Sequence, residues 1–166
     1  RFAAERAVAL AQSPGADGSQ LAFSYYVLGR LTLATDPELA LTSFLNAGRI
    51  YQSRPDTRVH EAHVALQIAA FQLSAGRGDI AEQLIDQNLD VVRRSQHAAL
   101  LSLMLLLKAE ALQIQNRPDD ADRVQQEALA WARYGFGDAE TIRQRSAEIL
   151  AISPRTRTGG RPGSPT

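Results

Sequence analysis

Apolar residues recur along most of the chain every three or four positions, and polar residues fill the positions between them. This spacing places the apolar side chains on one face of an α-helix, whereas a half-buried strand would need strict alternation, which the sequence lacks. Pro and Gly residues interrupt the pattern at regular intervals, as turns do. We therefore predict eight helices, over residues 1–12, 19–34, 37–53, 57–75, 79–95, 97–115, 118–134 and 138–152.

Capping residues support several of these limits. Asp36 is a suitable N-cap, and Pro37 then occupies the first helical position, where its missing N–H costs nothing. Pro118 begins a later helix in the same way. Acidic side chains follow it, and Asp138 and Glu140 begin the last helix, so negative charge lies at the positive end of each helix dipole.

The helical pattern ends at residue 153. Residues 153–166 consist of Pro, Gly, Ser, Thr and Arg, and they hold no large apolar side chain that could order the segment. We predict one helical domain over residues 1–152 and a disordered tail over 153–166. An alternative is a basic arm that contacts an acidic partner through Arg155, Arg157 and Arg161.

Composition narrows the function classes. Of the 166 residues 45% are hydrophobic, so a core can be buried, and 18 basic side chains balance 18 acidic ones. A neutral chain has no net attraction for nucleic acid or an anionic membrane surface. The absence of cysteine excludes disulfides, thiolate zinc sites and cysteine nucleophiles. The longest apolar run, residues 98–107, is interrupted only by Ser102 and is shorter than the roughly 20 residues of a membrane span.

The compartment depends on what preceded the first residue. The chain begins at Arg1 and its one methionine is Met104, which indicates a processed product or a fragment of a longer protein. We expect a cytoplasmic protein. A secretory leader removed before Arg1 would instead make it periplasmic or secreted.

An internal repeat is the most informative feature of the sequence. Three helices carry a set of mainly small or apolar residues at the same spacing, four and then three residues apart. The sets are Ala40, Phe44 and Ala47, then Ala81, Ile85 and Asn88, then Ala121, Gln125 and Ala128. A further small residue, Gly29, Ala69 or Ala109, precedes each set by eleven or twelve positions. Small residues at such places let two helices approach closely.

These residues resemble the tetratricopeptide repeat (TPR) family. The units are Tyr25, Leu28, Gly29, Ala40, Phe44 and Ala47, then Ala65, Ile68, Ala69, Ala81 and Ile85, then Leu105, Ala109, Leu112, Ala121 and Ala128. The resemblance implies a right-handed superhelix of antiparallel helix pairs, with three repeats over 19–135, the end of a truncated repeat at 1–12 and a capping helix at 138–152. The sequence departs from the family in its repeat length of 40 to 41 residues against the usual ~34, and in Asn88, Gln125 and Lys108.

The resemblance also implies a function. Repeats of this kind bind extended peptides or partner helices on the concave face lined by the first helix of each pair. The residues expected in that groove are Phe23, Tyr26, Arg30, His63, Leu66, Glu110 and Gln113. Most of the wall is apolar, so we expect a hydrophobic peptide or helix as the partner of a non-enzymatic scaffold. The long units resemble those of bacterial regulators of the maltose-activator type, which implies a larger regulator or assembly factor.

Two alternatives to an open groove remain. Leu66 and the leucines of 97–115 would be core residues if a neighbouring helix, or the helix 138–152, covered them. The domain would instead be a self-association module if its apolar face formed homodimers.

Catalytic and metal-binding motifs are weak by comparison. His60 and His63 share a helix face, but their spacing differs from that of zinc peptidases and a third ligand is not evident. Asp119, Asp120 and Asp122 fit a helix start better than a calcium loop. The Gly pairs at 76 and 78 and at 135 and 137 follow no strand and therefore fit turns rather than phosphate loops. We predict no catalytic residue, cofactor or metal, and no nucleic-acid partner.

Overall fold

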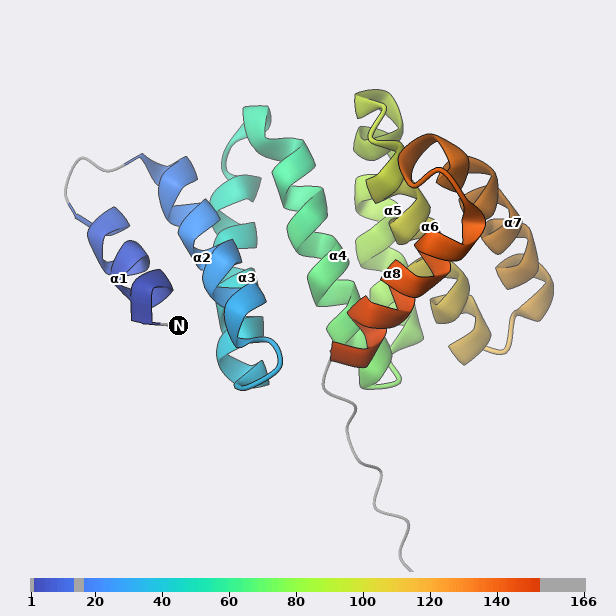
Figure 1. The fold of residues 1–166 in the computed structure, drawn as a ribbon, viewed down its shortest axis with the longest axis horizontal. Coiled ribbons are helices and arrows are strands. Elements are labelled where there is room, and N and C mark those ends of the chain that lie inside the picture. The colour runs from blue at the N-terminus through green and yellow to red at the C-terminus, as the bar shows by residue number, and fades with distance from the viewer. Residues whose placement is uncertain (1, 14–16, 153–166) are drawn as a thin grey trace, which may run out of the picture.

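The computed structural model describes residues 2–13 and 17–152, and this part of the chain is all-α, as predicted (Figure 1). Its helices are α1 (Phe2–Ala11), α2 (Gly18–Thr32), α3 (Pro37–Gln52), α4 (Arg58–Ser74), α5 (Gly78–Ser95), α6 (Ala98–Ile114), α7 (Pro118–Gly135) and α8 (Ala139–Ile152), with a 3₁₀ turn, η1 (Pro55–Thr57), before α4. The predicted disordered tail lies outside the described residues. No helix in the described ranges has the length and apolar character needed to cross a membrane.

The eight predicted helices are present, and their ends differ from the predicted limits by at most two residues. The caps explain this agreement. The Asp36 carboxylate accepts a hydrogen bond from the backbone N–H of Leu39 (3.1 Å), and Pro37 is the first helical residue. Asp138 accepts bonds from the backbone N–H and the hydroxyl of Thr141 at 2.6 and 3.0 Å. The turn η1 was not predicted.

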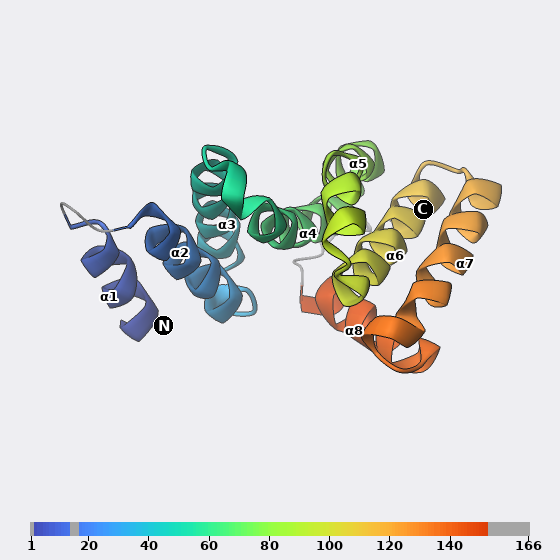
Figure 2. The same cartoon turned by 90° about the horizontal axis from the view of Figure 1, so that it is seen from above.

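Each helix packs mainly against its neighbours in the chain, and α8 is the exception. Viewed from above, α3 and α5 lie on one side of the row of helices and α8 lies on the opposite side (Figure 2). There α8 packs against α4, α6 and α7. Ile142 is fully buried, and Ile149 and Leu150 pack against the core. The structure therefore covers the α6 end of this face with the chain's own last helix.

The repeated residues lie at helix contacts. Of the three sets, Ala40, Phe44, Ala47, Ala81, Ile85, Ala121 and Ala128 are all buried. Asn88 is also buried, and its amide donates to the backbone oxygen of Leu84 (2.9 Å), so a polar residue is satisfied there. Gln125 is exposed. A Cβ on Gly29 would lie 2.7 Å from the Phe44 ring, so α2 and α3 approach closely because this residue is glycine.

Two large core clusters share α4. One holds Phe44 and Tyr51 of α3 with Val64, Ile68 and Phe71 of α4, and the other joins α4 to α5, α6 and α7. Neighbouring residues of α4 thus pack into different clusters, which makes nearly every residue from Val64 to Leu73 buried. α4 is therefore the helix that joins the two clusters.

Candidate functional site

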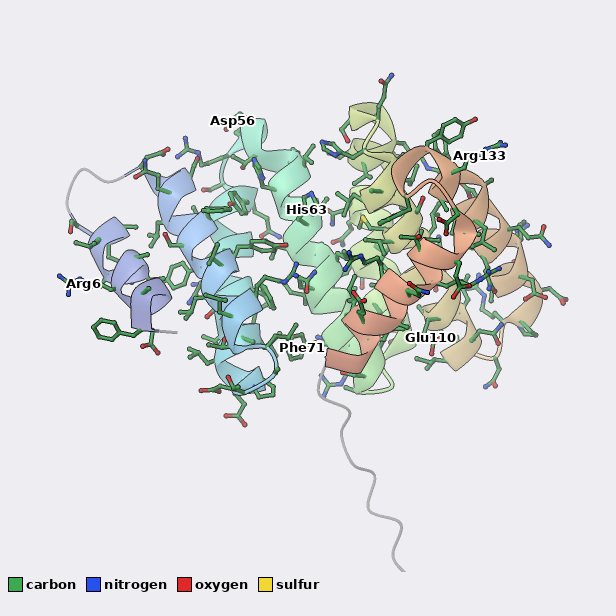
Figure 3. The ribbon with its side chains drawn as sticks, viewed as in Figure 1. Arg6, Asp56, His63, Phe71, Glu110 and Arg133 are labelled. Atoms are coloured by element: carbon green, nitrogen blue, oxygen red, sulfur yellow. The ribbon has the colours of Figure 1, made fainter. Side chains whose placement is uncertain are left out.

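Four of the predicted groove residues lie around one hollow. Phe23 and Tyr26 of α2 and His63 of α4 line a cavity of about 220 Å³ together with Tyr51 and His60. Arg30 lies beside it, one turn beyond Tyr26 on α2. We call the five lining residues the aromatic hollow. In Figure 3, His63 is on the face of α4 that is turned toward the viewer, between α2 and the end that α8 covers.

A wider hollow opens from the first one toward the N-terminus. It has a volume of about 750 Å³ and shares Phe23, Tyr51 and His60 with the aromatic hollow. Its remaining lining comes from α1, the start of α2 and η1, and comprises Ala7, Leu10, Ala11, Ser19, Gln20, Ser24, Asp56 and Thr57. Because they share Phe23, Tyr51 and His60, we treat the two hollows as one groove and call it the α1–α2–α4 groove.

Helical spacing and a cap orient the α2 side of the groove. Phe23, Tyr26 and Arg30 are spaced by three and four residues, so they share one face of the helix. Asp17 caps α2 by accepting a bond from the N–H of Ser19 (3.1 Å). The same carboxylate pairs with the guanidinium of Arg54 (2.9 Å), which ties the start of α2 to the α3–α4 connection.

Tyr26 is held between the core and the groove. Its ring centroid lies 6.0 Å from that of Phe44, which in turn contacts Phe71 edge-on at 6.3 Å. The Tyr26 hydroxyl accepts a long bond (3.4 Å) from the Arg30 guanidinium. The hydrophobic part of the side chain is thus fixed by buried rings, while its polar end lies at the groove surface.

Tyr51 and His60 join the two hollows. The ring of Tyr51 is buried and stacks on His60 with centroids 5.5 Å apart. Thr57 fixes the intervening turn, since its hydroxyl donates to the backbone oxygens of Tyr51 and Arg54 at 3.0 and 2.9 Å. Burial, and secondly Tyr26, raises the pKa of Tyr51, so this residue is a neutral phenol at physiological pH.

His63 is half-buried and faces His97 at the start of α6, with ring centroids 6.3 Å apart and the planes nearly perpendicular. Burial lowers the pKa of His63, and the charges of His97, His60 and Arg30 lower it further. His63 is therefore mainly a neutral imidazole at neutral pH. It presents one N–H donor and one acceptor nitrogen to the groove.

The other predicted groove residues are not part of this site. Leu66 is 2% exposed and belongs to the core cluster of α4–α7. It is therefore a core residue, which was the alternative prediction for it. Glu110 and Gln113 are exposed on α6 but line neither hollow. Figure 3 places Glu110 beside α8, away from His63. The two hollows thus lie between α1, α2 and α4, and the predicted groove residues of α6 line neither of them.

Sequence reasoning missed Leu10 and Tyr51, and it interpreted His60 as a surface or groove histidine without including it among the expected groove residues. These residues come from three different helices, so no periodic spacing links them. The resemblance to TPR units assigns groove positions only to first helices, whereas Tyr51 is the last buried residue of a second helix. Its one sequence signal is an aromatic residue two positions before the Ser-Arg-Pro turn.

A second exposed surface lies at the other end of the molecule. Trp131 and Tyr134 of α7 have ring centroids 5.8 Å apart, and Arg133 lies 5.1 Å from the Tyr134 ring. A cavity of about 320 Å³ is lined by Arg93, Gln96, Ala98, Leu101, Trp131 and Tyr134. We call the residues that line this cavity, together with Arg133, the α7 patch. Tyr134 is 68% exposed and Trp131 is 38% exposed, so the patch presents two large aromatic side chains to solvent.

Comparisons of the chain with protein-family models, with curated proteins and with solved structures find no match. Functional interpretation therefore rests on the geometry of the α1–α2–α4 groove and on the repeated helical pattern. Within the described ranges, no three His, Asp or Glu side chains are placed to hold a metal ion. His60 stacks on Tyr51 while His63 faces His97, so the two imidazoles of the predicted pair have different neighbours.

Proposed function

We propose that the chain is a non-enzymatic, TPR-like scaffold that binds an apolar peptide or helix of a partner protein in the α1–α2–α4 groove. The observation that carries the proposal is Phe23, whose side chain is 58% exposed at the junction of two hollows lined mainly by aromatic and aliphatic groups. Close helix crossings at Gly29 and at the repeated alanines support the TPR-like interpretation.

The groove has the chemistry of a protein-binding surface. Leu10 and Phe23 are both exposed at its wider part, and burying a side chain of this size against a partner contributes about 1.5–3 kcal/mol. Tyr and Arg residues, here Tyr26 and Arg30, are the types that most often dominate binding energy. The Tyr26 ring packs against Phe44 of α3, which packs against Phe71 of α4. Because this ring is already held in place, it needs little ordering when a partner binds.

A selection from a phage-displayed library of random dodecapeptides tests the groove. We expect peptides selected on the whole chain to bind the Tyr26→Ala/Arg30→Ala variant at least about tenfold more weakly, because two central contacts are lost. The matched control is Glu110→Ala/Gln113→Ala, two exposed groove candidates that line neither hollow, and it should bind like the original chain. Affinities are measured by fluorescence anisotropy with synthetic copies of the selected peptides.

Glu110→Ala/Gln113→Ala should melt like the original chain, because both side chains are exposed. Tyr26→Ala/Arg30→Ala should melt at a somewhat lower temperature, because the Tyr26 ring packs against Phe44, and its circular dichroism spectrum should show that it is still folded. Peptides that bind the Tyr26→Ala/Arg30→Ala variant undiminished would place the binding surface elsewhere. Loss of binding in the α6 control alone would move it to the face beside α8.

In the wider proposal, the chain is the docking part of a larger bacterial regulator or assembly factor in the cytoplasm.

The α7 patch favours self-association as a second candidate function, because Trp131, Tyr134 and Arg133 together have the composition of an interface centre. We expect, if this candidate holds, a dimer mass by sedimentation equilibrium at high micromolar concentration. Trp131→Ala/Tyr134→Ala should then return the mass to that of one chain. A single-chain mass for the unmodified protein at that concentration would remove this candidate and leave the groove proposal untouched.

A further inference from the structure

Protonatable and cationic side chains converge on the α1–α2–α4 groove from three helices. Arg30 comes from α2, His60 and His63 from α4, and His97 from the start of α6. The chain contains three histidines in all, and each is at or beside the groove. This surface therefore holds one permanent cation, Arg30, together with three imidazoles that can bind a proton.

Carboxylates are scarce around the same groove. Among the described residues that line either hollow, Asp56 is the one acid, and it is exposed and lies 3.9 Å from the guanidinium of Arg54. The charged groups of the described chain that act on His63 are His97, His60 and Arg30, and all of them are basic. The groove thus combines aromatic walls with Arg30 and several imidazoles, and its lining holds a single acid among the described residues.

Arg30 has no acidic partner among the described residues. Its guanidinium bonds to the neutral Tyr26 hydroxyl, and no ion pair of Arg30 with a described residue is found. A guanidinium held by a neutral partner retains most of its donors, which match the geometry of a carboxylate. His63 lies across the hollow from Tyr26 and can add a further N–H.

We propose that the groove recognises a peptide in which an Asp or Glu side chain lies next to a large apolar residue, the apolar side chain filling the aromatic hollow and the carboxylate lying between Arg30 and His63. This inference rests on the proposed peptide-binding function and specifies the partner's chemistry. Electrostatic complementarity of this kind fixes the register of a peptide that apolar contacts alone would leave free to slide.

The same arrangement predicts pH dependence. His63 has a lowered pKa, so in the empty groove it is largely neutral near pH 7. A bound carboxylate favours the protonated imidazole and raises that pKa, which means that binding takes up a proton. Affinity should therefore rise as the pH falls from about 7.5 to about 5.5, where Asp and Glu side chains, with ordinary pKa values of about 4, are still ionised.

Peptides from the library selection described above provide the test. We call a selected peptide groove-dependent if Tyr26→Ala/Arg30→Ala weakens its binding. We expect groove-dependent peptides to carry Asp or Glu beside a large apolar residue, and replacing that acid by Asn or Gln should weaken binding about tenfold. Arg30→Met should weaken binding of the acidic peptide, while its amide counterpart should be little affected, and Arg30→Lys should recover part of the loss. His63→Gln should remove most of the pH dependence, so that the affinity of this variant for the acidic peptide is nearly the same at about pH 7.5 and at about pH 5.5.

A direct readout comes from the imidazole signals in NMR spectra, because the chain contains only three histidines. Addition of the acidic peptide should raise the pKa of His63, and the matched amide peptide should not. Groove-dependent peptides that lack acids, or that bind equally at both pH values, would overturn this inference and leave the proposed function intact. Failure to select any groove-dependent peptide would overturn both.

Discussion

Phe44→Ala is expected to lower the free energy of unfolding by about 3–5 kcal/mol, the largest effect of any substitution considered. Phe44 is fully buried and its ring contacts Tyr26, Phe71 and the backbone face at Gly29. Truncation removes the ring's burial and leaves a cavity that α2 cannot close without moving. Domains have about 5–15 kcal/mol of stability in total, so the variant should be near the limit of folding.

Urea denaturation followed by circular dichroism measures this effect. The matched control is Leu45→Ala, the next residue of the same helix, whose side chain is 47% exposed and whose loss should cost less than about 1 kcal/mol. Equal losses for the two variants would contradict the packing of α2 on α3. Phe44→Leu should be milder than Phe44→Ala, and it should still weaken peptide binding because Tyr26 loses its aromatic support.

Local signals account for what the sequence predicted well. Helix ends are set within a few residues by caps such as Asp36 and Asp138, whose side chains bond the backbone three positions ahead. The small residues at Ala81 and Ala121 are likewise visible in the sequence because the helix contact repeats along the chain. Both features depend on neighbours within one helix or one repeat, so the sequence carries them directly.

The open part of the groove depended on contacts that no local pattern reveals. α8 follows α7 in the chain but packs against α4 and α6 as well, and the repeat resemblance contains no rule for that return. Its docking separates Glu110 from the site that His63 helps to form. Tyr51 reaches the aromatic hollow from a second helix because η1 turns the chain there, and that turn was not predicted.

The glycines also show that contacts between helices cannot be read from a local sequence pattern. The sequence predicts turns at both Gly pairs, and Gly76 and Gly137 do adopt positive φ angles of 73° and 84°. Gly78 and Gly135 are instead helical residues that touch a neighbouring helix. A Cβ on Gly135 would lie 2.4 Å from the backbone nitrogen of Ala99. Turn glycines and contact glycines look alike in sequence and differ only once the helices are packed.

Gly78→Ala is expected to destabilise the protein by about 1–3 kcal/mol. The added methyl would lie 2.6 Å from the backbone oxygen of Ala111 and 3.1 Å from the Ile114 side chain. A flexible side chain could give way, but a helix backbone can relieve this overlap only if the start of α5 moves away from the end of α6. Such a shift would disturb the contact between two helices of the larger core cluster.

Replacing Gly48 by alanine should have the opposite effect on stability. Gly48 lies inside α3, and its added Cβ would meet Val64 at 3.4 Å, an ordinary contact. Because alanine loses less backbone entropy than glycine when a helix forms, Gly48→Ala should stabilise the protein by about 0.5–1 kcal/mol. Thermal and urea unfolding of both variants measure the difference. Stabilisation by Gly78→Ala would mean that α5 and α6 are further apart than the structure has them, since helix propensity would then exceed any steric cost.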